Sequence, residues 1–182
     1  KLIVTGRDEK RTTETFKMLT GTNHLSFTTD LLIEQDMDSL VAKLPPLDGI
    51  VHCAGIVGPT PVKFIRKENI EKLLKINFEV PVLLTSKILL SKKLVDKASI
   101  VFLSSVATQM PYFGGALYNS SKSAIESYSK TVALELVKRG IRSNCLSPGL
   151  VNTPLIKKPV TDGQMEIVDE SLGRYLKKYP MG

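Results

Sequence analysis

Residues 99–122 read SIVFLSSVATQMPYFGGALYNSSK, and this stretch decides the fold. It opens on an apolar run, Ser99–Ser104, with the length and β-branched content of a buried strand. A loop with the pair Gly114-Gly115 leads into a helical pattern over Tyr118–Arg139, which Gly140 ends. A buried strand followed by an amphipathic helix indicates an α/β fold.

The same alternation runs through the rest of the chain. The pattern predicts strands at 2–5, 25–27, 49–53 and 141–146, and helices at 8–19, 33–44, 68–94 and 163–179. Apolar strands that alternate with helices are typical of parallel strands covered on both faces and joined by right-handed crossovers. We therefore expect one α/β domain over residues 1–182, with a doubly wound parallel sheet of the Rossmann-like, three-layer α/β/α kind.

Composition narrows the class of protein. The net charge is +7, but the basic residues are scattered, mostly as pairs at expected helix ends, so we expect solvated faces and no nucleic-acid partner. No apolar run approaches the roughly 20 residues that span a bilayer, and no charged-then-apolar leader is present, so we expect no membrane association. The two cysteines, Cys53 and Cys145, predict reduced thiols and a cytoplasmic location, and no spacing suggests a metal site.

Tyr118 and Lys122 are four residues apart, which places both side chains on one face of the expected helix. A lysine ammonium beside a phenol favours the phenolate, so we expect it to lower the pKa of Tyr118 from its usual value of about 10 towards the working pH. A tyrosine with such a pKa acts as a general acid or base. The same spacing also occurs in ordinary helix-surface pairs, so the context of the pair matters.

Three features surround this pair. Ser105 lies 13 residues before Tyr118, directly beyond the expected strand, where a hydroxyl can point into the crevice at the strand ends. Asn77 lies inside the long expected helix, where asparagine is a poor helix residue and frees backbone groups for water or a ligand. Ala54-Gly55 and Pro148-Gly149 follow two more strands. Together these positions predict one crevice at the carboxyl ends of the strands.

In order and separation, this set resembles the catalytic tetrad of the short-chain dehydrogenase/reductase (SDR) family, of the small single-domain kind that includes the 3-oxoacyl-carrier-protein reductases. The resemblance implies that Tyr118 passes a proton to or from the substrate oxygen, while nicotinamide gives or takes hydride. It implies that Ser105 hydrogen-bonds the same oxygen, and that Lys122 binds the nicotinamide ribose. Asn77 would anchor a water that links Lys122 to solvent. Two donors on an oxygen that gains charge stabilise that charge.

The resemblance also implies cofactor contacts. Arg7 stands where relatives that use NAD carry an acid, and with Thr5 it suits a 2′-phosphate, so NADP(H) is favoured over NAD(H). The alternative for Arg7 is an ordinary solvated residue at a helix start. The other expected contacts are to adenine from Asp30 and Leu31, to the carboxamide from Val151 and Thr153, and along the crevice from Cys53, Ala54, Gly55, Tyr118, Lys122, Pro148 and Gly149.

The chain departs from the family pattern in two places. His52-Cys53 replaces the usual Asn-Asn, so we expect His52 to be a hydrogen-bonded core residue and Cys53 to lie near the cofactor. None of the 12 glycines forms the family's glycine-rich phosphate turn. We therefore expect the domain to be incomplete at both ends, without the first strand and its glycine-rich turn and without the final helix and strand.

Residues 155–179 correspond to the family's substrate-covering loop and helix. Their apolar residues suit an acyl or other hydrophobic carbonyl substrate, and Lys157 and Lys158 suit an anionic carrier of the acyl group. A helix packed on the sheet edge explains the same pattern. A 3-oxoacyl thioester is the default substrate, because relatives of this size most often reduce it. Relatives also pair through the long helices, here 68–94 and 118–139, so we expect a homodimer or homotetramer.

Two other functions stay open on the sequence. One is an NAD-dependent dehydrogenase of a sugar or steroid alcohol, which a strong preference for NADH would favour. The other is a non-catalytic dinucleotide-binding scaffold protein on the same fold. Scaffold proteins of this kind lose the tyrosine or the lysine, and both are present here with Ser105 and Asn77. The sequence thus favours an NADP-dependent oxidoreductase that acts on a carbonyl or secondary alcohol.

Overall fold

The computed structural model describes residues 1–151 and residue 153, which form four βα units and a last strand. In chain order the elements are β1 (Ile3–Gly6), α1 (Glu9–Lys17), β2 (Leu25–Thr28), α2 (Glu34–Lys43), β3 (Leu47–His52), α3 (Lys67–Leu74), α4 (Val80–Leu90), β4 (Leu94–Leu103), α5 (Ala116–Leu136) and β5 (Arg142–Leu146). A π-helical turn, Lys75–Glu79, joins α3 to α4. The expected helix at 163–179 and the expected substrate-covering segment 155–179 lie outside the described residues.

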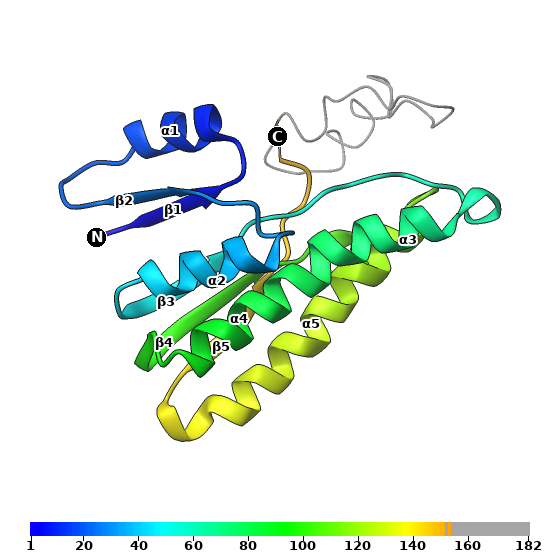
Figure 1. The fold of residues 1–182 in the computed structure, drawn as a ribbon. Helices are drawn as coiled ribbons and strands as arrows, with labels where there is room; N and C mark the ends of the chain where they lie inside the picture. Colours follow the sequence, from blue (N-terminus) through cyan, green and yellow to red (C-terminus); the bar gives the residue numbers. More distant parts are fainter. Residues whose placement is uncertain (152, 154–182) are drawn as a thin grey trace.

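Every strand pair is parallel, as the α/β prediction requires, but the strands form two sheets. β1 pairs with β2, and Ile3 lies opposite Leu25. In the second sheet β4 lies between β3 and β5, with Val101 opposite Val51 and Asn144. Within the described residues, the second edge of β1 and the second edge of β3 have no partner strand (Figure 1). The expected doubly wound sheet is therefore interrupted between β1 and β3.

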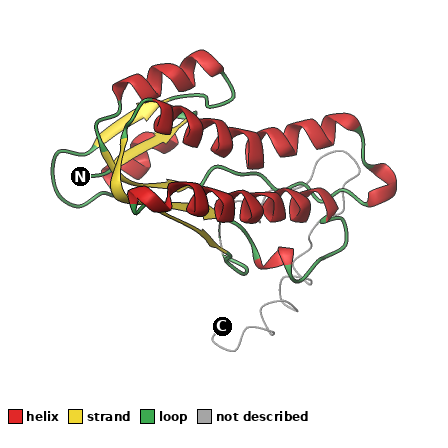
Figure 2. Cartoon of the chain, turned by 90° about the horizontal axis from the view of Figure 1, so that it is seen from below, coloured by secondary structure: helices red, strands yellow, loops and turns green. Residues whose placement is uncertain are grey.

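Helices flank the strands as in a layered α/β fold. α1 packs on the β1–β2 sheet, while α4 and α5 pack on one face of the β3–β4–β5 sheet. Figure 2 shows the α3–α4 helix and α5 side by side. The opposite face is bare within the described part of the chain, since Val51 is 60% and Leu146 is 57% exposed. The sequence predicted helices on both faces of these strands, and the described residues place helices on one face only.

The core lies between the β3–β4–β5 sheet and its helices. Ile100 and Phe102 of β4 are at most 1% exposed, and they share a cluster with Ile88 of α4 and Ile125 of α5. Their alternation with the less buried Val101 is the two-residue period of a strand that has one covered face. Burying a side chain of this size contributes about 1.5–3 kcal/mol, so the cluster holds α4 and α5 against the strands.

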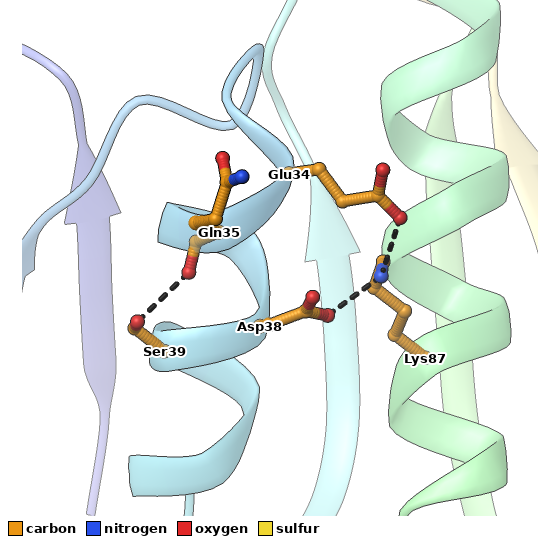
Figure 3. Close-up of polar contacts among 5 residues, drawn as sticks. All are labelled: Glu34, Gln35, Asp38, Ser39 and Lys87. Atoms are coloured by element: carbon orange, nitrogen blue, oxygen red, sulfur yellow. Dashed lines mark hydrogen bonds and ion pairs between the residues drawn. The ribbon is translucent and has the colours of Figure 1, made fainter.

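α2 connects the two sheets. Its Met37 belongs to the same core cluster, and Lys87 of α4 reaches two of its carboxylates (Figure 3). The Lys87 ammonium lies 3.0 Å from Glu34 and 2.6 Å from Asp38. Both contacts raise the pKa of Lys87, the hydrogen bond to Asp38 most. Because both carboxylates are exposed, solvent screens these ion pairs, and apolar packing contributes most to the junction.

The boundaries differ from the expected ones mainly around 68–94. The single helix expected there is divided by the π-helical turn, and it ends at Leu90 shortly before Lys92, which adopts a left-handed conformation with φ of 52°. β4 starts at Leu94, before the expected start at Ser99. Lys97, with φ of 65°, falls where the register with β3 shifts, which explains why the sequence pattern showed only the second half of this strand.

Candidate active site

The four expected catalytic residues lie around the carboxyl ends of β3, β4 and β5, where ligands of parallel sheets bind. Ser105 is the second residue after β4, and its Oγ accepts a hydrogen bond from the Ala107 amide at 3.2 Å. Tyr118 and Lys122 lie in the first two turns of α5. Asn77 lies in the π-helical turn before α4 and is 1% exposed. Residues that are far apart in the chain are thus brought to the same end of the strands.

Tyr118 is half-buried beside Ser105. Burial raises the pKa of its phenol, and a hydrogen bond with Ser105 lowers it by a smaller amount. The expected lowering of the Tyr118 pKa by Lys122 is not found. The Lys122 ammonium lies 5.8 Å from the centre of the phenol ring, and it donates to the carbonyl of Leu103 at 2.8 Å. The balance of these effects favours the neutral phenol of Tyr118 over the phenolate.

Lys122 is a buried cation that is 6% exposed. Burial lowers its pKa, and the nearby thiols of Cys145 and Cys53 raise it by smaller amounts. An ammonium has three donor protons, of which the Leu103 carbonyl accepts one. A buried ammonium at this point is suited to bind hydroxyl groups of a ligand.

The side chain of Asn77 fixes the loop that follows β3. Its Oδ1 accepts the Ile56 amide at 2.8 Å, and its Nδ2 donates to the Ile56 carbonyl at 2.9 Å. Nδ2 also lies 3.1 Å from the Ser121 hydroxyl oxygen of α5. Gly55 is held so close that a Cβ there would lie 3.4 Å from both Asn77 Oδ1 and Lys122 Nζ. The structure thus adds a bracing role to the water-anchoring role expected for Asn77.

Pro81 explains the π-helical turn. In an α-helix the carbonyl of Asn77 accepts the amide four residues later, but proline has no N–H to donate. The helix instead widens over Lys75–Glu79, where the Val80 amide donates to the carbonyl of Lys75. Such turns occur frequently at functional sites, and here the turn places the Asn77 side chain against Ile56 and Ser121.

The expected cofactor residues near the tetrad follow β3 and β5. Cys53 is exposed, and desolvation raises its thiol pKa more than the Lys122 ammonium lowers it. The Val106 amide donates to the Pro148 carbonyl at 3.1 Å, which joins the loops after β4 and β5. Ala54 is exposed, Gly55, Pro148 and Gly149 are partly buried, and further along Val151 is exposed and Thr153 partly buried.

The other expected cofactor residues belong to the β1–β2 sheet. Thr5 is in β1, and Arg7 follows it directly; both are exposed, and among the described residues Arg7 makes no ion pair. Asp30 and Leu31 follow β2, and Asp30 Oδ1 accepts the Leu32 amide at 3.0 Å in a local turn. The structure therefore places the expected nicotinamide and adenine contacts at the carboxyl ends of two separate sheets.

A family model described as short chain dehydrogenase matches residues 1–163. The chain belongs to the short-chain dehydrogenase/reductase family. It is 34% identical over 137 residues to dehydrogenase/reductase SDR family member 4 of Homo sapiens, covering 72% of this chain and 49% of that protein. It is 27% identical over 187 aligned residues to the 3-oxoacyl-[acyl-carrier-protein] reductase of Rickettsia typhi, covering 100% of this chain and 72% of that protein.

The fold is likewise similar to solved SDR structures. A serine dehydrogenase from Escherichia coli matches with a TM-score of 0.74 and 27% identity, covering 85% of this chain and 74% of the other. The chain spans about half the length of the first curated relatives, 49% for the human protein and 54% for a cyclopentanol dehydrogenase of Comamonas testosteroni. Members of the SDR family are oxidoreductases that bind nicotinamide dinucleotides and act on CH–OH or carbonyl groups.

His52, one departure from the SDR pattern, is a hydrogen-bonded core residue, as expected. Its ring stacks on Phe102 with centroids 4.8 Å apart, and its Nε2 lies 2.9 Å from Thr85 Oγ1. The Thr85 hydroxyl donates to the Pro81 carbonyl at 2.7 Å, so His52 Nε2 is the donor to Thr85. Burial lowers the pKa of His52 to about 4, which leaves the imidazole neutral at physiological pH.

Sequence reasoning missed one acidic residue of this SDR site. Glu126 lies one turn beyond Lys122 on α5, and its Oε1 accepts the hydroxyl of Ser104 at 2.6 Å. The four-residue spacing from Tyr118 to Lys122 continues to Glu126, and this spacing is the signal that identifies it. Among the described residues no cluster of His, Cys, Asp and Glu is suited to hold a metal ion. In that same part of the chain, no helix has the length and hydrophobicity needed to cross a bilayer.

Proposed function

We propose that this SDR protein is an NADP(H)-dependent oxidoreductase that reduces a carbonyl compound or oxidises the matching secondary alcohol. The main observation is that the Tyr118 phenol lies beside the Ser105 hydroxyl, with the Lys122 ammonium 5.8 Å from the centre of the phenol ring. A proton donor, a second hydroxyl donor and a buried cation are the groups that a carbonyl oxygen needs as it becomes an alcohol.

The residues around Lys122 fit a nicotinamide dinucleotide. The absence of a side chain at Gly55 keeps a space open between Asn77 Oδ1 and Lys122 Nζ, and the buried ammonium offers donors for ribose hydroxyls. Lys122 and the Pro148-Gly149 turn would hold the nicotinamide half, with Val151 and Thr153 at the carboxamide. When bound, the dinucleotide supplies or takes the hydride.

Each residue of the tetrad has its own task in this proposal. Tyr118 donates its phenol proton to the substrate oxygen, and Ser105 donates a second hydrogen bond to that oxygen as negative charge develops there. Because burial raises the Tyr118 pKa, the proton stays on the phenol until the substrate oxygen takes it. The buried Lys122 ammonium binds the ribose hydroxyls of the nicotinamide half. A water held by Asn77 returns a proton from solvent towards Lys122.

Arg7 supports NADP(H) as the cofactor. Its guanidinium is exposed directly after β1, and it makes no ion pair with a described residue, so it is available for a 2′-phosphate. The nearby acid Asp8 caps α1 by accepting the Arg11 amide at 2.9 Å, so it is engaged locally. A serine dehydrogenase of this fold was solved with NADP+ and a 3-ketoacyl-(acyl-carrier-protein) reductase with NADH. The fold therefore accepts either cofactor, and we propose that Arg7 selects NADP(H) here.

A largely apolar groove at the start of α5 supports a hydrophobic substrate. A hollow of about 460 Å³ adjoins the first turn of α5, where Ala116 and Asn119 flank Tyr118 in the sequence. Its walls include Pro61, Val62, Pro111 and Phe113. We therefore propose a ketone or 3-oxoacyl thioester with an apolar chain, and we propose that residues 155–179 cover it and meet an anionic carrier.

The unpaired edges of β1 and β3 support a proposal about the domain. A strand between them would join the two sheets into one, and the turn after it would lie at the carboxyl ends near Arg7 and Gly55. A turn at that place is where a glycine-rich segment and a helix N-terminus bind a pyrophosphate. We propose that such a strand and turn, with a final helix and strand, complete a single domain with residues 1–182.

Turnover assays of the full-length protein test the function. Oxidation of NADPH or NADH is followed with a panel of ketones, 3-oxoacyl thioesters, sugars and steroids. Tyr118→Phe is expected to lower kcat by roughly a hundredfold or more while changing the NADPH Kd less than about twofold, because it removes only the proton donor. Turnover that survives in Tyr118→Phe would show that the proton donor is another group.

The cofactor choice has its own test. We expect NADPH to have the lower KM, and Arg7→Ala is expected to raise the KM for NADPH by roughly tenfold with little effect on NADH, because one charged phosphate contact is lost. Arg11→Ala, an exposed arginine on α1, is the matched control. A wild-type preference for NADH contradicts the role of Arg7 and favours the NAD-dependent sugar or steroid alcohol dehydrogenase.

A further inference from the structure

One carboxylate oxygen of Glu126 accepts hydrogen bonds from hydroxyl groups on two different loops. Its Oε1 lies 2.6 Å from Ser104 Oγ, 3.1 Å from Thr108 Oγ1 and 3.4 Å from Ser147 Oγ. Ser104 and Thr108 belong to the loop after β4, and Ser147 follows β5, while Glu126 itself is on α5. Among the described residues no cation lies within ion-pair distance of this carboxylate, so hydroxyl groups satisfy it.

The contact with Ser104 is the strongest of the three. It is short, Ser104 is 5% exposed, and the acceptor is charged, which makes such a bond roughly twice as strong as a neutral one. The Thr108 hydroxyl has one proton and two acceptors, Glu126 at 3.1 Å and the Ser105 carbonyl at 3.0 Å. The Thr108 contact is therefore shared, and the exposed Ser147 contact is long.

The residues that make these hydrogen bonds lie on both sides of Ser105 in the sequence. Ser104 precedes it directly, and Thr108 closes the turn that Ser105 caps. Tyr118 lies on the same helix as Glu126, two turns earlier. The backbone on both sides of the serine hydroxyl is thus held to the helix that carries the phenol by the Glu126 carboxylate, in addition to the bond from Lys122 to the Leu103 carbonyl.

We propose that Glu126 is a positioning residue of this SDR site, which holds the Ser105 hydroxyl at the distance from Tyr118 at which both can bind one substrate oxygen. The inference rests on the proposed function. It assigns Glu126 no contact with substrate or cofactor: its effect passes entirely through Ser105. A misplacement of a reacting group by about 1 Å can cost roughly a hundredfold in rate, so a loosened Ser105 is expected to affect kcat.

Turnover of matched variants is the first test. Glu126→Ala is expected to lower kcat by roughly ten- to a hundredfold with the NADPH Kd changed less than about twofold. Glu126→Gln keeps an acceptor oxygen and is expected to recover most of this loss. Glu135→Ala, an exposed glutamate on the same helix, is the control and is expected to match the wild type. Wild-type kcat in Glu126→Ala would overturn the proposal.

A double-mutant cycle separates positioning from general loss of structure. If Glu126 acts through Ser105, then Glu126→Ala is expected to cost little further kcat in a Ser105→Ala background. Additive losses in the double variant would overturn the proposal, because a general structural defect lowers kcat whichever residue is at 105.

A third measurement needs no turnover. The phenolate absorbance of each variant is titrated with and without Tyr118→Phe, and the difference reports the pKa of Tyr118. Because the Ser105 hydrogen bond lowers this pKa, we expect it to rise in Glu126→Ala and Ser105→Ala, and to stay unchanged in Glu135→Ala. A rise in Ser105→Ala alone would overturn the inference. If the wild type shows no turnover, the proposed function fails, and this titration still decides the role of Glu126.

Discussion

The imidazole of His52 is neutral because a buried ring lacks the water that would stabilise its cation, which lowers its pKa to about 4. In the unfolded chain the pKa returns to about 6.5, so the unfolded state binds more protons between these values and stability rises with pH there. We expect His52 to contribute about 3 kcal/mol to the free energy of unfolding above about pH 6.5, and this contribution to be lost as the pH falls to about 4.

Urea unfolding at a series of pH values measures this effect. The stability of His52→Gln is expected to vary less with pH in that window, because glutamine does not titrate. His24→Gln, which removes the other histidine, is the matched control and should keep the wild-type dependence. An unchanged dependence in His52→Gln would show that other groups account for it.

At this scale the sequence indicated the four residues of the proposed tetrad, and its expectation of a lowered pKa for Tyr118 was wrong. The four-residue spacing of Tyr118 and Lys122, and the place of Ser105 after a strand, are local features that a sequence displays. The pKa of Tyr118 depends on its burial and on the position of the Lys122 ammonium. That ammonium donates a hydrogen bond to the carbonyl of Leu103, which is 19 residues from Lys122 in the sequence. Glu126 was missed because its partners are hydroxyls of two loops that only the folded chain brings together.

Among the elements, the left-handed positions near α5 and β4 give the clearest stability prediction. Gly140, with φ of 66°, ends the turn after α5, and a Cβ there would lie 3.3 Å from Lys97 Cγ. We expect Gly140→Ala to lower the free energy of unfolding by about 1–2 kcal/mol and Lys97→Gly, also at positive φ, to raise it by about 1 kcal/mol.

Chemical unfolding checks both changes against Gly58→Ala. A Cβ at Gly58 meets no atom within 4 Å and its φ is not positive, so that variant should be neutral or slightly stabilising. Equal stability of Gly140→Ala and the wild type would mean that the turn relaxes without cost.

Helices and strands with strong periodicity were predicted well, and the failures have identifiable causes. The helix expected over 68–94 is divided because Pro81 cannot donate to the Asn77 carbonyl, a consequence that a pattern of apolar residues does not reveal. β4 begins earlier than expected because Lys97 interrupts its alternation.

For the whole molecule, the exposed apolar residues of α4 and α5 support self-association. Leu90 is 79% exposed on α4 and Leu134 is 75% exposed on α5. We propose that these faces pair in a homodimer or homotetramer, and we expect Leu134→Glu to shift the protein to monomer in sedimentation velocity, because a charge buried in an apolar interface is costly. Met18→Glu, equally exposed beyond α1, is the control; a monomeric wild type would contradict the proposal.

The parallel α/β class could be predicted because alternating strands and helices encode it. The interruption between β1 and β3 could not, since a sequence shows which segments are strands and not which neighbours complete a sheet. The exposed face of the β3–β4–β5 sheet, at Val51 and Leu146, could not be predicted for the same reason. The apolar character of these residues predicts burial but does not identify the helix or strand that would cover them.

Within residues 1–182, the division into two sheets also determines which part opens first. β1 and β2 pack on each other and on α1, and they reach the main core through partly buried side chains such as Ile3 and Phe27. Because little apolar surface is exposed when this unit separates, its amide hydrogens should exchange with deuterium through a local opening, long before those of Ile100 and Phe102. A protease that samples the open form would cut between residues 18 and 24 first, and the folded remainder would keep Ser105 and Tyr118 together.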